Sequence, residues 1–217
     1  MTPMTDSDAA DPIDPIDSAA KPAVRKRPKP GERRVQILQT LASMLEQPGA
    51  DRVTTAALAG KLDVSEAALY RHFASKAQMF EALIEFIEQS VFTLINQIVD
   101  RESVATVQAQ KMLTVLLQFG EKNPGMTRVM VGDALVFENE RLLTRMNQFF
   151  ERFESQLRQS LRGAAEAAGS ATPTVDANAQ ASVLTSFAVG RLQRFARSGF
   201  KRSPTEHLDV ALRMLAS

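Results

Sequence analysis

The chain has 217 residues, with 26 Lys and Arg against 25 Asp and Glu, no cysteine and only two histidines. This composition excludes disulfides, thiolate metal sites and thiol nucleophiles, and it supplies little for histidine-based metal or triad chemistry. No apolar run approaches the roughly 18 residues of a transmembrane helix, and the acidic N-terminus lacks the apolar core of a secretory signal, so we expect a cytoplasmic protein without a cofactor. Many Ala, Leu and Gln residues, with one Tyr and no Trp, favour an all-α fold.

The first 30 residues change the sign of their charge part-way. Residues 1–20 are acidic and contain prolines, with too few apolar residues to pack, and we expect them to be disordered. The following arm is basic and kept extended by prolines, so it can lie along DNA phosphates or enter a minor groove; a solubilising linker is the alternative. Its basic residues are Lys21, Arg25, Lys26, Arg27, Lys29, Arg33 and Arg34.

A three-helix head is predicted for residues 31–74. An amphipathic helix over residues 32–47 shows apolar residues at 3/4 spacing, and Pro48-Gly49 ends it. Its expected inward face holds Val35, Leu38, Leu41, Ala42 and Leu45.

Two short helices joined by a tight turn follow, from Thr54 to Phe73. Thr54 and Ser65 can cap them, because each hydroxyl can accept a hydrogen bond from an orphan backbone N–H. Ala59 is small where the two helices would cross. The inward residues are expected to be Ala57, Leu58 and Leu62 on the first helix, and Val64, Ala68, Leu69 and Phe73 on the second.

The outward side of the second short helix carries short or polar side chains with one aromatic ring and one guanidinium group, which suits a helix laid in a DNA major groove. An ordinary helical hairpin is the alternative. Ser75 and Gln78 predict a capping box for the next helix, and Lys76 lies in its first turn, where the helix dipole disfavours a cation. This placement is favourable if Lys76 reaches a phosphate beside the groove; a merely exposed lysine is the alternative. The candidate DNA-binding residues are Arg33, Arg34, Thr54, Thr55, Ser65, Glu66, Ala67, Ala68, Tyr70, Arg71, His72 and Lys76.

Residues 75–217 are predicted to form a larger helical body for dimerisation and partner binding. Its helices are expected from residue 75 to about 98, and over residues 104–122, 126–131, 139–168, 175–198 and 204–216. The penultimate helix has small residues at Ala179, Ser182, Ser186 and Gly190, which would let a second helix approach closely.

One short recognition helix makes few base contacts, whereas two heads about one helical turn apart read a palindrome with the specificity of both. We therefore expect a homodimer, with intramolecular core packing of the small residues as the alternative. The candidate interface residues are Ser182, Val183, Ser186, Phe187 and Gly190.

The head, arm and body together resemble the TetR family of bacterial DNA-binding proteins. Within that family the resemblance is to nucleoid occlusion factors, and it covers the chain from about residue 32 to the C-terminus. It rests on VSEAALYRHF at residues 64–73, SK at 75–76, MF at 79–80, LIEFIE at 83–88, FGEKNPG at 119–125, NQFFER at 147–152, QLRQ at 156–159 and RFARS at 194–198.

The resemblance implies a dimer that binds palindromic chromosomal sites, lies on the nucleoid and antagonises the division protein FtsZ by binding its C-terminal tail. The implied FtsZ groove lies between the long helix after the head and the next helix. An apolar slot with a cationic rim suits a peptide that is apolar in the middle and acidic at its edge. As alternatives, Phe86 and Phe119 can be plain core, and Lys122 and Asn123 can simply cap the C-terminus of their helix. The implied residues are Phe86, Leu94, Leu116, Phe119, Lys122 and Asn123.

Two residues depart from the family pattern. Asp63 stands in the turn where glycine is usual, and Asp tolerates a left-handed conformation there at a cost of about 1 kcal/mol. Leu94 replaces an expected basic residue, which changes the charge pattern of the groove.

Two other functions are weighed against division inhibition. A ligand-responsive TetR-type repressor would use the apolar interior of the body as an effector pocket. An enzyme is not expected, because we find no convergent carboxylate pair, Gly-rich phosphate loop or nucleophile–base arrangement.

Overall fold

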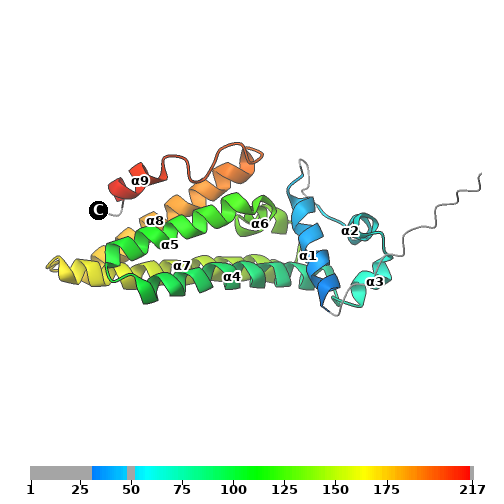
Figure 1. Ribbon diagram of the computed structural model, residues 1–217, viewed down its shortest axis with the longest axis horizontal. Coiled ribbons are helices and arrows are strands. Elements are labelled where there is room, and N and C mark those ends of the chain that lie inside the picture. The colour runs from blue at the N-terminus through cyan, green and yellow to red at the C-terminus, as the bar shows by residue number, and fades with distance from the viewer. Residues whose placement is uncertain (1–30, 48–51, 216–217) are drawn as a thin grey trace, which may run out of the picture.

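The computed structural model describes residues 31–47 and 52–215. Over these ranges the chain contains helices and no strand, as the all-α prediction requires (Figure 1). The predicted acidic and basic segments of residues 1–30 lie outside the described residues. The helices are α1 (Glu32–Leu45), α2 (Thr55–Leu62), α3 (Glu66–Tyr70), α4 (Lys76–Arg101), α5 (Ala105–Lys122), α6 (Pro124–Met130), the 3-10 helix η1 (Asp133–Leu135), α7 (Glu140–Ala167), α8 (Pro173–Arg197) and α9 (Leu208–Leu215).

The predicted helix caps of the head are confirmed. The hydroxyl of Thr54 accepts the backbone N–H of Ala57 at 3.1 Å, and that of Ser65 accepts the N–H of Ala68 at 3.3 Å. Asp63 adopts the left-handed conformation, with φ 54° and ψ 51°. The turn between α2 and α3 thus forms without the glycine that usually supplies this conformation.

The inward faces of the head helices differ from the prediction at two positions. Val35 is 53% exposed, whereas Ile37 is fully buried and takes the place expected for Val35 in the core. On α2, Ala57 is exposed while Leu58 and Ala59 are buried. The spacing of apolar residues along a helix defines an apolar stripe, but which residues of the stripe become buried depends on the helices packed against it.

The body is an elongated bundle in which α4, α5, α7 and α8 run along the long axis, with α1 crossing one end (Figure 1). Helix α7 packs most extensively on α8, and α5 lies against α4, α7 and α8. Buried side chains from these helices form the core, including Met112, Leu113, Leu116, Leu117, Phe149, Phe153, Leu157 and Leu184.

Helix α4 is long and apolar enough, by length and composition alone, to cross a membrane, although none was expected. Its buried residues lie at helical spacing, for example Leu83, Ile87, Val91 and Ile95. This face contacts α5 and α7, and two glutamates of α4 at its border form ion pairs with arginines of α7. Because a core helix of a water-soluble bundle passes the same test, the result is weak evidence for membrane insertion.

The C-terminal elements differ from their predicted bounds. Helix α8 begins at Pro173, which is favourable at the first position of a helix because it needs no hydrogen-bond partner for its nitrogen. The last helix begins only at Leu208, since residues 204–207 form turns and His207 has φ +53°. The loop before it is tied to α5, because the hydroxyls of Ser203 and Thr205 donate to the carboxylate of Glu121.

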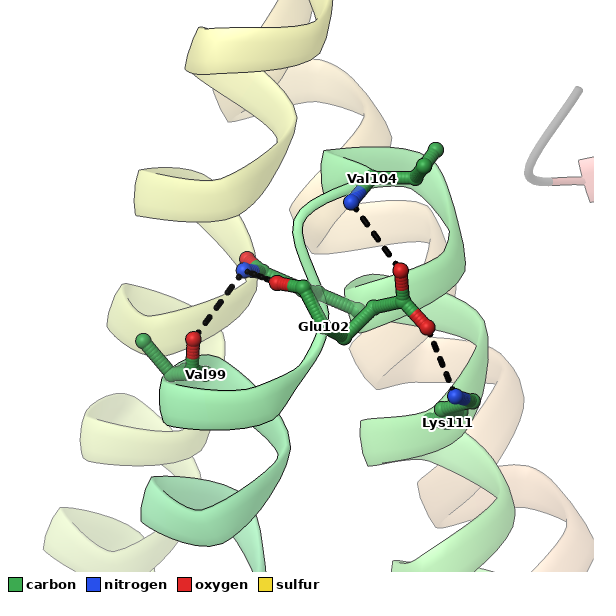
Figure 2. Close-up of polar contacts among 5 residues, drawn as sticks. Val99, Glu102, Val104 and Lys111 are labelled. Carbon is green, nitrogen blue, oxygen red and sulfur yellow. Dashed lines mark hydrogen bonds and ion pairs between the residues drawn. The ribbon is translucent and has the colours of Figure 1, made fainter.

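The connection between α4 and α5 is held by the polar network drawn in Figure 2. Glu102 accepts the backbone N–H of Val104 at 3.0 Å and pairs with Lys111 at 2.7 Å. The hydrogen bond from Lys111 lowers the pKa of the Glu102 carboxyl, and the Val104 N–H adds to this effect. The side chain of Gln108 donates to the carbonyl of Glu102 at 2.6 Å and accepts the Ser160 hydroxyl at 2.8 Å, which joins this corner to α7.

Candidate DNA-binding, partner-binding and dimer surfaces

The recognition segment is shorter than predicted. Helix α3 ends at Tyr70, and the next turn is closed by the N–H of His72, which donates to the carbonyl of Leu69 at 2.9 Å. Tyr70 is 46% exposed, and Arg71 and His72 are exposed beside it. Helices α2 and α3 lie beyond α1, at the end of the molecule opposite the C-terminal half of the bundle (Figure 1).

Several candidate DNA-binding residues bond to other residues of the head. The hydroxyl of Thr55 donates to the Glu66 carboxylate at 2.6 Å, which fastens α2 to α3. Ala68 is only partly exposed, whereas Ser65, Glu66 and Ala67 are exposed. The first residues of α3 therefore form an exposed edge that a DNA major groove could accept.

Arg34 braces the end of the recognition segment. Its guanidinium group donates to the carbonyl of His72 at 2.7 Å and lies 4.0 Å from the centre of the Phe73 ring. Phe73 itself is buried. Arg34 thus fixes the position of Arg71 and His72 from α1, whereas the sequence suggested only a contact with DNA.

Lys76 also bonds within the molecule. Ser75 caps α4 by accepting the N–H of Gln78 at 3.2 Å, and Gln78 accepts the N–H of Ala74, a variant of the predicted capping box. At the first position of α4, the ammonium group of Lys76 forms an ion pair with Glu138. Lys76 is therefore partly buried and paired, because Glu138 compensates the unfavourable interaction of this cation with the helix dipole. A contact between Lys76 and a DNA phosphate stays a prediction.

Two of the candidate partner residues, Phe86 and Leu94, line separate grooves. Phe86 is 47% exposed and lines an apolar groove of about 170 Å³ between α1, α4 and α6, together with Val35, Leu38 and Met126. Leu94 is 43% exposed and lines another, of about 210 Å³, between α4 and α5. The sequence did not reveal that α1 contributes to the first groove, because Val35 and Leu38 were assigned to the core of the head.

The remaining partner candidates differ in exposure. Lys122 is exposed at the end of α5, and Asn123 donates to the carbonyl of Phe119 at 2.8 Å, as a helix-capping residue does. Phe119 is half-buried and packs against the core. Leu116 is fully buried, so its inclusion among surface residues was wrong: the inner face of α5 places it in the core.

The candidate dimer residues lie along the outer side of α8. Ser182, Ser186 and Gly190 are exposed, Val183 is 51% exposed, and Phe187 is half-buried. No atom lies within 4 Å of the position that a Gly190 Cβ would occupy, so the backbone is open to a close approach there. Phe187 also packs against the core of its own chain, so part of this ridge takes part in intramolecular packing.

Helix α7 extends this surface. A groove of about 470 Å³ between α7 and α8 is lined by the apolar residues Leu143, Phe150 and Val189 and by charged residues such as Glu151 and Arg158. The hydroxyl of Thr185 in the same groove is buried and has no hydrogen-bond partner.

Comparison with known proteins identifies both halves of the chain. Residues 37–83 match the tetR family of bacterial regulatory proteins, and residues 103–217 match the tetracycline repressor-like C-terminal domain of SlmA-like proteins. The nucleoid occlusion factor SlmA of Photobacterium profundum is 50% identical over 190 residues, which are 87% of this chain and 96% of that protein. The chain belongs to the SlmA group of the TetR family.

Other members of the SlmA group show the same extent of similarity. SlmA of Vibrio cholerae is 51% identical over 186 residues, which cover 85% of this chain and 94% of that protein.

Among solved structures, the fatty acid degradation regulator FadR of Bacillus halodurans has a TM-score of 0.71 at 13% identity, covering 88% of this chain and 97% of that chain. PfmR of Thermus thermophilus has a TM-score of 0.69 at 18% identity, and the match covers 83% of this chain and 97% of that chain. These structures support the TetR fold.

Proposed function

We propose that the chain is a nucleoid occlusion factor: a homodimer that binds palindromic chromosomal DNA and inhibits cell division over the nucleoid by antagonising FtsZ. The observation that carries the proposal is the 50% identity to nucleoid occlusion factors across both head and body. Similarity to the TetR fold alone would support only DNA binding by the head, because one fold can serve different functions and the fold does not say what the body binds.

The DNA-binding part of the proposal rests on the exposed edge of the head. Tyr70, Arg71 and His72 offer an exposed aromatic ring, guanidinium group and imidazole at the end of α3. Ser65, Glu66 and Ala67 are small or polar enough to let the helix enter a major groove. On this proposal residues 31–74 bind DNA and the body carries the dimer and partner surfaces.

The dimer part rests on the ridge of small residues on α8 and the neighbouring groove between α7 and α8, which combines apolar and charged side chains. Val183, Phe150 and Leu143 supply apolar area, and Gly190 lets backbones approach. Exposed apolar patches flanked by polar residues are typical of protein–protein contacts. A twofold contact of this ridge with its own copy would bring two heads onto one palindrome.

The FtsZ part rests on the apolar groove around Phe86 and the cation at Lys122. The groove is lined almost entirely by apolar atoms of Val35, Leu38, Leu83 and Met126, and the exposed Lys122 adds positive charge at the end of α5. An extended or helical peptide with an apolar centre and an acidic edge matches this chemistry.

The proposal is tested by mixing the chain with FtsZ and GTP, with and without cognate DNA, and measuring sedimentable polymer. We expect polymer to decrease when DNA carrying the palindrome is present, whereas unchanged polymer would refute the division-inhibitor function. Phe86→Asp and Lys122→Glu should retain DNA affinity and lose the effect on FtsZ. As a control, Arg71→Ala should weaken DNA binding and reduce its salt dependence. Loss of both activities in one variant would indicate misfolding.

The ligand-responsive repressor is less well supported. The interior where an effector would bind is occupied by side chains such as Phe149, Phe153 and Leu157, each at most 2% exposed. Mapping the chromosomal DNA bound by the protein separates the two functions. Sites scattered around the chromosome support nucleoid occlusion, and one site beside a single gene supports a repressor.

A further inference from the structure

One ion pair connects the DNA-binding head to the start of α7. Lys76 is the first residue of α4, and Glu138 precedes Asn139, the N-cap of α7. The two side chains are only 23% and 9% exposed. We propose that this pair is a positioning contact that sets the separation and angle of the two heads in the dimer, and thereby selects the spacing of DNA half-sites. The inference rests on the proposed function.

The pair is rigidly connected to the recognition segment. Phe73 is buried, and Arg34 holds the carbonyl of His72 at 2.7 Å. Ser75, two residues after Phe73, caps α4, and the backbone N–H of Ala74 donates to the side chain of Gln78 at 2.9 Å. Since each link between α3 and Lys76 is hydrogen-bonded or buried, a displacement of Lys76 moves the recognition segment with it.

On its other side the pair belongs to a polar seam between α4 and α7. Arg141 pairs with Glu81 at 2.8 Å, and Arg145 binds both carboxylate oxygens of Glu88, at 3.1 and 2.6 Å. The hydrogen bonds from Arg145 to Glu88 also raise the pKa of Arg145. The partners advance together along both helices, so α4 and α7 run parallel, and α7 carries part of the proposed dimer surface. The seam thus fixes each head relative to the dimer axis.

The charges at the pair make a positioning role more favourable than a phosphate contact. A cation at the first position of a helix opposes the helix dipole, and a largely buried carboxylate is unfavourable without a partner. Lys76 and Glu138 compensate each other, and the Lys76 ammonium also lies 5.7 Å from the centre of the Phe80 ring. A Lys76 that reached for DNA would leave Glu138 unpaired at 9% exposure.

DNA geometry supplies a readout that stability alone would not change. Adding one base pair between half-sites separates them by about 3.4 Å and rotates one against the other by roughly 35°. A dimer with fixed heads should bind one spacing much better than its neighbours. A dimer with loosened heads should bind several spacings with similar affinity.

The experiment measures the affinity of the full chain for palindromes whose spacer is shortened or lengthened by one or two base pairs. Lys76→Gln and Glu138→Gln should each reduce the preference for the best spacing by about threefold or more, and the double variant should do no worse, as expected for directly coupled residues. The charge reversal Lys76→Glu with Glu138→Lys should restore part of the preference. As a matched control, Lys111→Gln with Glu102→Gln removes an ion pair at the far end of α4 and should leave spacing unchanged.

Three results would overturn the inference. The first is that Glu138→Gln has no effect, while Lys76→Gln lowers the affinity for palindromes of every spacing equally and reduces the salt dependence of binding. This result would indicate that Lys76 contacts a phosphate. The second is an unchanged spacing preference in both single variants. The third is a loss of dimer or of thermal stability that accounts for the change in binding. If the wild-type chain binds no palindrome, the proposed function itself fails instead.

Discussion

Replacing Gly125 by alanine should separate the head helix from the body. A Cβ at Gly125 would lie 2.0 Å from the carbonyl oxygen of Ala42 and 2.9 Å from its carbonyl carbon. Both atoms belong to the backbone of α1, so no side-chain rotation relieves the overlap. Helix α1 must therefore move away from α6, and the head must move with it.

The expected loss of stability follows from two opposing effects. Forcing an extra methyl group into a packed contact costs about 1–3 kcal/mol. Alanine has a better helix propensity than glycine by up to about 1 kcal/mol, which offsets part of this cost. We expect a net loss of about 1–2 kcal/mol, and since each kcal/mol shifts the midpoint of a chain of this size by about 2–4 °C, Tm should fall by roughly 2–8 °C.

Gly163→Ala is the matched control, because Gly163 lies inside α7, near its C-terminal end, and no atom of another part of the chain lies within 4 Å of its Cβ position. There only the gain in helix propensity remains, so Tm should rise by a few degrees. Thermal unfolding of both variants, followed by circular dichroism at equal protein concentration, measures the difference. A Gly125→Ala variant as stable as Gly163→Ala would show that α1 and α6 do not pack as described.

Three further predictions concern the dimer, the head and the loop after α4. Val183→Asp, at a side chain 51% exposed, should yield a folded monomer by sedimentation, with DNA affinity in the nonspecific range of about 10⁻⁴ to 10⁻⁶ M; a stable dimer would place the interface elsewhere. Thr55→Val removes the 2.6 Å hydrogen bond to Glu66 and should lower the free energy of unfolding by about 0.5–1.5 kcal/mol, whereas an unchanged denaturation midpoint would contradict this. Because Lys111 lowers the pKa of Glu102, their pair stabilises the fold at neutral pH and this contribution disappears as the pH falls through the lowered pKa. Lys111→Met should therefore be less stable than wild type at pH 7 and equally stable in strong acid by urea denaturation.

Local features of the head could be predicted from the sequence because they depend on neighbours along the chain. The caps at Thr54, Ser65 and Ser75 need only a hydroxyl and an amide three residues later. The left-handed Asp63 follows from the tight turn between two helices. Similarly, apolar spacing was enough to find the long helices of the body.

Contacts between distant residues could not be predicted in this way. Lys76 and Glu138 are 62 positions apart, and Arg34 and His72 are 38 apart. Nothing in the sequence near a lysine or an arginine says which distant carboxylate or carbonyl it will meet, so both residues were assigned to DNA. The exposure of Val35 and the burial of Leu116 depend in the same way on which helices pack against α1 and α5.

The groove around Phe86 connects partner binding to the position of the head. Three of its lining residues, Val35, Leu38 and Gln39, belong to α1. Phe86 and Met126 belong to the body. A shift of α1 therefore changes the groove as well as the recognition segment that Arg34 braces. Gly125→Ala should then weaken both DNA binding and the binding of an FtsZ tail peptide, whereas Phe86→Asp should weaken only the latter. Fluorescence anisotropy with labelled palindrome and labelled peptide tests this; a Gly125→Ala variant that loses only one of the two would show that the groove and the head move independently.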